Sequence, residues 1–256
     1  MFSKSPWADR MAFKGGTSLS KCYGLIERFS EDIDLILDWR VLGFSDIYPW
    51  EERSKTSQDK LNKEMDAKTA TFLSEVFLPT LKEDFSHLLS EPYELYIKDD
   101  EPQTICFAYP RLFENPAIFR IPKTNILTVM AKRTFWEKVT ILHKEAFRAT
   151  GKFPNRYSRH YYDLYCMEKT EIKEQAYKDL DLLNQVVLFK SRFYPTNAAR
   201  YDLAKPGTMK LLPSEENMII LADDYEHMRD MIFGEIPSFT DIIKTLKRME
   251  TEINRL

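Results

Sequence analysis

The stretch FKGGTSLSKCYGLIERFSEDIDLIL (residues 13–37) decides how the N-terminal part of this chain folds. Two adjacent glycines, Gly15 and Gly16, favour a turn directly before a helical pattern over residues 17–27. An apolar run over residues 33–37 then predicts a strand. The segment therefore predicts a glycine turn, a helix and a strand in that order.

Asp32 and Asp34 stand one residue apart in this otherwise apolar run. Residues i and i+2 of a strand share a face, so we expect both carboxylates on one side, with Ile33 and Leu35 packed on the core. Two close carboxylates repel unless a cation lies between them. Oxygen ligands of this kind suit Mg²⁺ or Mn²⁺ bound together with phosphate oxygens. The pair predicts a metal site over a nucleoside triphosphate (NTP), although a solvated strand end would have the same pattern.

The residues before the aspartates supply features that suit phosphate binding. Gly15 and Gly16 allow close approach of the backbone to a ligand, and a helix that follows them directs free N–H groups at an anion. Thr17 could cap that helix or bind a phosphate, and Lys21 would add positive charge one turn later. An ordinary turn with an ordinary cap remains the alternative for each residue taken alone.

Composition limits the class of protein. The 256 residues are 43% hydrophobic and 30% charged, which is enough for one large or two modest folded domains. The net charge of −3 is unlike that of a general nucleic-acid coat protein, although a local basic site is still allowed. Three separated cysteines and the lack of a long apolar run predict a cytoplasmic protein without a membrane span.

The order of the elements predicts an α+β fold with a mostly helical C-terminal half. We expect strands over 93–97 and 104–109, joined by a turn at KDDEPQ, after a helix over 54–84. Thr134 and Glu137 have the spacing of a capping box, so we expect a helix over 134–149. Further helices are expected over residues 156–169, 171–193, 214–233 and 239–255. The domain boundary is expected near residue 130, giving domains 1–130 and 131–256.

Four separated motifs resemble one known family. KGGTSLSK (14–21) and RFSEDIDL (28–35) look like the AbiEii-type nucleotidyltransferase toxins, which belong to the DNA-polymerase-β-like nucleotidyltransferase superfamily. KRTFWEKVTILHKEAFR (132–148) and RYSRHYYDLYCM (156–167), with the tail from about residue 206, are also similar to that family. The resemblance implies a nucleotidyltransferase-like mixed sheet with flanking helices, followed by a helical domain that completes the active site.

The resemblance also implies roles for residues in the two later motifs. The family's lysine and later aspartate match Lys138 and Asp163, which implies phosphate binding for Lys138. For Asp163 it implies support of the site, including action as a base on the acceptor hydroxyl. We expect Arg159 to help bind the nucleotide, although Arg159 and Asp163 are also spaced as an ordinary helical ion pair.

A third carboxylate, which the superfamily normally has, is not identifiable in the sequence. Glu114 lies beside a proline, and Glu94 is a weak candidate on a predicted strand. This absence favours one metal ion over two and a reduced activity.

The sequence and the resemblance together predict a metal-dependent nucleotidyltransferase toxin. It would transfer a nucleoside monophosphate (NMP) from an NTP to an acceptor hydroxyl, with tRNA as the favoured acceptor and an antitoxin encoded nearby. Such toxins act in toxin–antitoxin or phage-defence systems. Two alternatives remain: transfer of NMP to a protein hydroxyl, and a non-catalytic module that binds nucleotide or protein.

Overall fold

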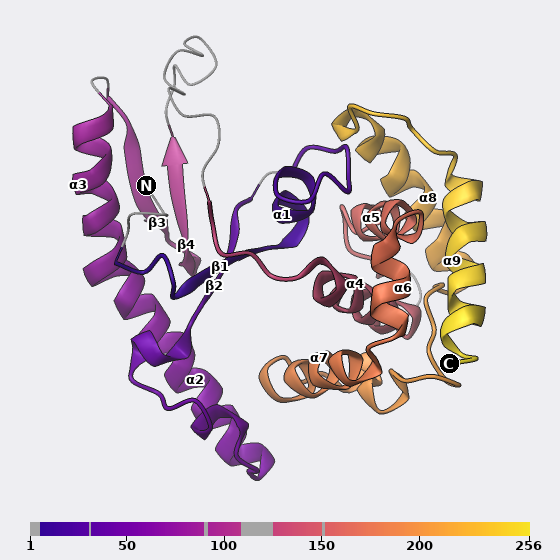
Figure 1. Cartoon of the computed structure of the whole chain (residues 1–256), viewed down its shortest axis with the longest axis horizontal. Helices are drawn as coiled ribbons and strands as arrows, with labels where there is room; N and C mark the ends of the chain where they lie inside the picture. Colours follow the sequence, from indigo (N-terminus) through magenta and orange to yellow (C-terminus); the bar gives the residue numbers. More distant parts are fainter. Residues whose placement is uncertain (1–5, 31, 90–91, 109–124, 150–151) are drawn as a thin grey trace. The chain divides into compact units, whose positions relative to one another are not determined.

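The computed structural model describes residues 6–30, 32–89, 92–108, 125–149 and 152–256. Contacts divide the chain into two units (Figure 1): Met1–Ala12 with Ile36–Leu127, and Phe13–Leu35 with Thr128–Leu256. The segment 13–35 therefore groups with the C-terminal helices, whereas the expected division at residue 130 put it with the N-terminal half.

The first unit consists of a long helical run and a β-hairpin. Its elements are η2 (Trp39–Leu42), η3 (Tyr48–Trp50), α2 (Lys55–Phe72), the π-helical turn η4 (Leu73–Phe77), α3 (Leu78–Leu88), β3 (Glu94–Lys98) and β4 (Glu101–Ala108). Helix α2 begins after Ser54 because the Ser54 hydroxyl accepts a hydrogen bond from the Ser57 amide. The expected helix over 54–84 is thus present, with a π-turn in its middle.

The hairpin turn is tighter than the sequence predicts. β3 pairs antiparallel with β4, and Lys98 lies opposite Glu101. The Lys98 ammonium lies 2.6 Å from Glu101 Oε1, so the charged residues expected in the turn form the last cross-strand pair instead. The expected end of the second strand at residue 109 lies outside the described residues.

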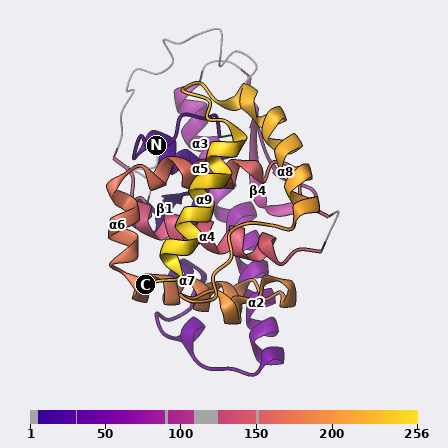
Figure 2. The same cartoon turned by 90° about the vertical axis from the view of Figure 1, so that its right-hand side faces the viewer.

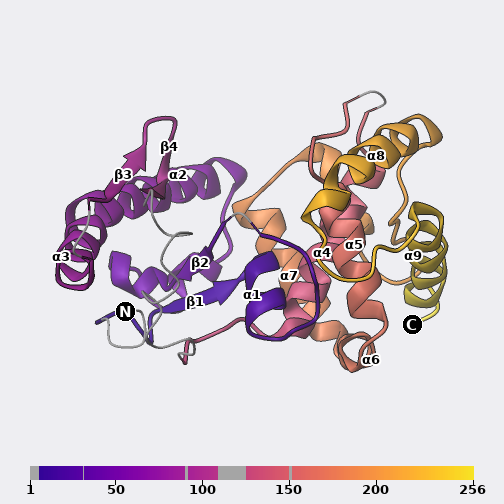
Figure 3. The ribbon, with the colours of Figure 1, turned by 90° about the horizontal axis from the view of Figure 1, so that it is seen from above.

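The second unit is mostly helical. Its helices are α1 (Gly15–Lys21), α4 (Ala131–Ala146), α5 (Ser158–Glu168), α6 (Glu171–Tyr177), α7 (Leu180–Phe193), η6 (Asn197–Ala199), η7 (Tyr201–Leu203), α8 (Glu215–Met228), η8 (Arg229–Met231) and α9 (Phe239–Ile253). α4 contacts α5, α6 and α7, while α5 also contacts α8 and α9 (Figure 2). α4 and α5 lie between α1 on one side and α8 and α9 on the other (Figure 3).

The core of this unit forms around α4. Phe135, Trp136, Val139 and Leu142 recur at helical spacing and are fully buried. Burying such a side chain stabilises a fold by about 1.5–3 kcal/mol, so this face fixes where α4 lies. The core thereby holds Lys138, on the same helix, in a defined position.

Two predictions of helix ends were wrong. α4 begins at Ala131, so Thr134 lies inside the helix, buried, and does not cap it. The expected helix over 171–193 is divided into α6 and α7. Asp179 causes the division, because its carboxylate caps α7 by accepting a hydrogen bond from the Leu182 amide at 3.1 Å.

The two strands near the glycines and aspartates are short. β1 (Met11–Lys14) pairs with β2 (Asp34–Leu37), and Phe13 forms an isolated parallel bridge with Thr128. The α+β composition agrees with the prediction, but the strands of the described ranges form two separate two-stranded sheets. No helix among the described residues has the length and apolar character needed to cross a membrane.

Candidate functional site

The two glycines lie at the start of α1, where other residues approach them closely. Gly15 has φ +75, and a Cβ atom there would lie 2.2 Å from Asp34 Oδ2. A Cβ atom on Gly16 would lie 2.6 Å from a guanidinium nitrogen of Arg28. Both contacts are shorter than real Cβ atoms make, so a Cβ atom at either position would force the Asp34 or the Arg28 side chain to shift. The positive φ of Gly15 also favours glycine there. The glycine turn and the aspartate motif are therefore in direct contact.

Thr17 does not cap the helix, because α1 already begins at Gly15 and its N-cap is Lys14. The Thr17 hydroxyl instead donates a hydrogen bond to the backbone oxygen of Asp32. α1 also ends earlier than expected, at Lys21, which is exposed in the last turn. Lys21 lies about 9 Å along the axis from Gly15, so the helix does not bring its charge beside the glycines.

Asp32 and Asp34 are both exposed, but only Asp34 lies on β2, and Asp32 precedes the strand. The strand begins at Asp34, one residue later than expected, and Ile33 is 62% exposed. The prediction that Ile33 packs on the core was therefore wrong. The two carboxylates are accessible to a ligand in solution.

A buried ion cluster lies behind the glycine turn. Asp163 is fully buried on α5 and binds Arg28 through two hydrogen bonds, at 2.7 Å to Nε and 2.8 Å to Nη2. Its Oδ2 also lies 2.6 Å from the Lys138 ammonium. Arg28 and Lys138 are 3% and 4% exposed. We call Arg28, Lys138 and Asp163 the buried ion cluster; it joins the segment 13–35 to α4 and α5.

The cluster keeps its aspartate ionised. Burial raises the pKa of Asp163, but Lys138 and Arg28 outweigh burial and hold that pKa well below its usual range. Burial lowers the pKa of Lys138, and Asp163 partly offsets the effect. His160 Nδ1 lies 3.4 Å from the Lys138 ammonium, and burial together with that charge lowers the pKa of His160 well below 6.5. His160 is therefore neutral near pH 7 and can accept from Lys138.

Arg159 does not form the helical ion pair that its spacing allows. The Asp163 carboxylate is taken by Arg28 and Lys138 instead. Arg159 Nε is buried and has no hydrogen-bond partner among the described residues. A buried donor without a partner is energetically costly.

Sequence reasoning missed Arg28 and the contact of His160 with Lys138. Arg28 stands in the motif RFSEDIDL, four residues before Asp32. Its positive charge was the only feature of the sequence that indicated a role for it. A cation followed by exposed aspartates in a mostly apolar segment needs a partner if it is buried, but the partner is 135 residues away along the chain.

The donor set around Asp34 fits a hard divalent cation. Two accessible carboxylates supply oxygen ligands, and Gly15 leaves room where a Cβ atom would press on the Asp34 carboxylate. Within the described ranges, no group of three or more His, Cys, Asp or Glu side chains could hold a metal ion. Asp32 and Asp34 thus supply two exposed carboxylates, which are the ligand type that a hard divalent cation prefers.

The third carboxylate is still not identified. Glu94 lies on β3 in the first unit, where its side chain is exposed, and Glu114 lies outside the described residues.

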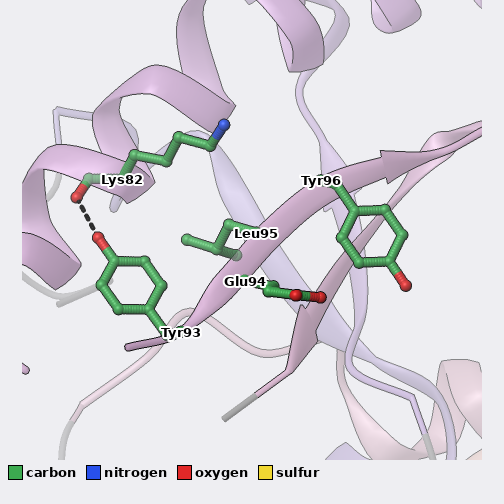
Figure 4. A pocket seen from close by; sticks show the side chains of 5 residues that line it. All are labelled: Lys82, Tyr93, Glu94, Leu95 and Tyr96. Carbon is green, nitrogen blue, oxygen red and sulfur yellow. Dashed lines mark hydrogen bonds between the residues drawn. The ribbon is translucent and has the colours of Figure 1, made fainter. Parts of the chain in front are cut away.

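A surface hollow of about 470 Å³ lies in the first unit, between α3 and β3 (Figure 4). Its lining residues are Lys82, Tyr93, Glu94, Leu95 and Tyr96. The Tyr93 hydroxyl donates to the Lys82 backbone oxygen at 2.8 Å. The hollow is open, and none of the glycine, aspartate or ion-cluster residues lines it.

Comparison with known families agrees with the motifs. The model of the family described as "Nucleotidyl transferase AbiEii toxin, Type IV TA system" matches residues 1–245. The resemblance seen in the sequence is thereby confirmed over most of the chain. No curated protein and no solved structure matches this chain.

Proposed function

Since the chain belongs to the AbiEii family of nucleotidyl transferase toxins of type IV toxin–antitoxin systems, we propose that it transfers an NMP from an NTP to a tRNA hydroxyl. The observation that carries this proposal is the direct contact between Gly15 and the Asp34 carboxylate. That contact brings a backbone that can approach phosphates next to a carboxylate that can hold a metal ion.

In the proposed reaction, the acceptor oxygen forms a bond to the α-phosphorus of the NTP. The bond from that phosphorus to the bridging oxygen of the β-phosphate breaks, pyrophosphate leaves, and the hydroxyl proton passes to solvent. Asp32 and Asp34 would hold Mg²⁺ or Mn²⁺, which when bound neutralises charge on the triphosphate.

The chain's own residues bind and orient the nucleotide. Gly15, Gly16 and Thr17 approach the phosphates through the start of α1. Lys138 and the free donor of Arg159 stabilise negative charge at the phosphates. Lys21 contributes only to the general positive charge around the site, because it lies at the far end of α1.

We propose that Asp163 is a positioning residue and not a base. A general base works best when its pKa is near the working pH, whereas Arg28 and Lys138 hold the pKa of Asp163 far below that. Removing its charge would leave two cations buried without a counter-ion. Asp163 thereby fixes Lys138 and the segment that leads from Arg28 to Asp32.

The proposed acceptor is tRNA. The sequence has a basic stretch from Lys144 to Arg159, which suits a phosphate backbone. The structure supports only part of that stretch, because Arg148 donates to the buried carboxylate of Glu145. The proposed partners are NTP, tRNA and an antitoxin encoded nearby, and the proposed location is the cytoplasm, where these substrates occur.

The test is incubation of the purified protein with Mg²⁺, total bacterial RNA and each of the four α-labelled NTPs in turn. We expect label in RNA of tRNA size, and none with the variant Asp32→Ala/Asp34→Ala. Asp223→Ala, which removes an exposed aspartate on α8, is the matched control and should keep full activity. Label on a protein band would replace tRNA by a protein hydroxyl as the acceptor. Binding of NTP without transfer of any label would overturn the transferase proposal.

A further inference from the structure

The backbone turns in a strained conformation directly before α5. Arg156 has φ +62, in the left-handed region that residues other than glycine rarely adopt. The N-cap of α5 is Tyr157, whose side chain makes no capping hydrogen bond. Strain of this kind persists only where the surrounding structure holds it. The support for the turn, and the partner of the free N–H groups at the start of α5, must therefore come from another part of the chain.

That support is Asp224 on α8. Its Oδ1 accepts a hydrogen bond from the Arg156 backbone N–H, and its Oδ2 accepts one from the Ser158 backbone N–H at 2.9 Å. These two amides lie on either side of Tyr157, so one carboxylate fixes three consecutive residues. A carboxylate is also favourable at the positive end of a helix dipole. Asp224 therefore acts as an N-cap for α5 that is supplied by a different helix.

Tyr157 connects this turn to the candidate site. Its backbone oxygen accepts a hydrogen bond from the His160 backbone N–H at 3.0 Å. The rings of Tyr157 and His160 pack edge to face, with their centroids 5.2 Å apart. His160 Nδ1 in turn lies 3.4 Å from the Lys138 ammonium. The contacts thus run without a break from Asp224 through Tyr157 and His160 to Lys138.

We propose that Asp224 is a positioning residue, which holds the turn before α5 and thereby places Arg159 and His160 in the candidate site. These two residues are the second and third of α5, directly after the amide that Asp224 binds. Without the carboxylate, Arg156 can leave its left-handed conformation and the first turn of α5 can fray. The effect of Asp224 on nucleotide transfer rests on the proposed function, whereas the placement of His160 does not.

The surroundings of His160 make its placement measurable. Burial is the largest cause that holds the pKa of His160 well below its usual value of about 6.5. The positive charges of Lys138, Arg159 and Arg28 lower this pKa further, and only the nearby charge of Asp163 raises it. If the first turn of α5 frays, His160 moves into water and away from these charges, so its pKa returns towards the usual value.

The test compares Asp224→Ala with Asp223→Ala, which removes the exposed neighbouring carboxylate on the same helix. NMR titration of the histidine rings of the full chain, from about pH 5 to 8, follows all four histidines, and His160→Gln identifies the signal of His160. We expect the pKa of His160 to rise towards 6.5 in Asp224→Ala and to stay well below it in the wild type and in the control. Asp224→Asn keeps the shape of the side chain but only one acceptor oxygen, so it should give a smaller rise.

The asparagine variant decides the matter if the alanine variant does not fold. A cap that only stabilises α5 would lower the melting temperature and leave the titration of His160 in the folded protein unchanged, and that result would overturn the proposal.

The rate of NMP transfer is the second readout. Asp224→Ala should lower it by about tenfold or more at a temperature where the variant is folded, because small displacements of binding groups slow a reaction strongly. Asp223→Ala should keep the wild-type rate. A wild-type rate in Asp224→Ala would refute the positioning role. A shifted pKa of His160 in a protein whose wild type transfers no nucleotide would refute the proposed function but support the placement of His160 by Asp224.

Discussion

Replacing Asp163 by asparagine should destabilise the second unit strongly. Asp163 is fully buried between Arg28 and Lys138, with contacts of 2.6–2.8 Å to both cations. Removing one partner of a buried ion pair typically costs about 3–5 kcal/mol, because the other charge stays buried without compensation. For a unit of about 150 residues, each kcal/mol lowers the melting temperature by roughly 2–4 °C, so we expect a fall of about 6–20 °C.

Thermal and urea unfolding at pH 7 measure this loss, with Asp223→Asn on α8 as an exposed control that should stay within about 0.5 kcal/mol of wild type. The variant Asp163→Asn/Lys138→Met should recover part of the loss, because it removes one of the two orphaned cations.

The pH dependence checks the cause. The folded pKa of Asp163 is lowered, so its charge stabilises the fold above the unfolded-state pKa of about 3.9. The difference between wild type and Asp163→Asn should therefore be constant from pH 7 to about 5 and shrink below about 4. A loss under about 1 kcal/mol at pH 7 would refute a structural role for the buried ion cluster.

Three further outcomes follow from the same geometry. Gly15→Ala and Gly24→Ala both place a side chain at positive φ, at a cost of about 1 kcal/mol each. Only the Gly15→Ala side chain meets Asp34, so only this variant should lower the rate of NMP transfer, by more than tenfold at matched stability. The free energy of unfolding of the wild type, measured in urea, should fall as the pH drops below about 6.5, because the unfolded state then binds a proton that folded His160 does not. His160→Gln should remove this fall. The free energy of unfolding of the wild type should rise between pH 7 and about 10, where unfolded Lys190 is protonated and folded Lys190 is neutral. Lys190→Met should remove this rise. Equal slopes of unfolding free energy against pH for both proteins would contradict this.

The local parts of the fold were predictable from sequence because their causes are local. A helix was expected over residues 134–149, and Phe135, Val139 and Leu142, which recur at helical spacing, are all buried on α4. The order of glycines and aspartates predicted that they belong to one site, and Gly15 does contact Asp34. Family membership then follows from the same motifs.

The rest depended on contacts that a local pattern does not contain. Thr134 has the spacing of a cap, but packing of the helix on the core extends α4 three residues further back. Asp179 looks like an ordinary helical residue in a continuous polar pattern, yet it caps α7 and divides the helix. The role of Arg28 requires knowing that Asp163 lies beside it. Tertiary contacts thus decided where helices begin and which charges are buried.

The number of residues between Arg28 and Asp163 sets the time that passes, during synthesis, before the two side chains can pair. Their side chains bind each other across 135 residues. At a translation rate of about 5–20 residues per second, roughly 7–27 s pass between the synthesis of the one and of the other. During that interval a ribosome-bound chain carries the glycine turn and both aspartates but cannot yet anchor them. A chain that ended before Lys138 would therefore contain both N-terminal motifs in full but would lack the two residues that form the buried ion cluster with Arg28.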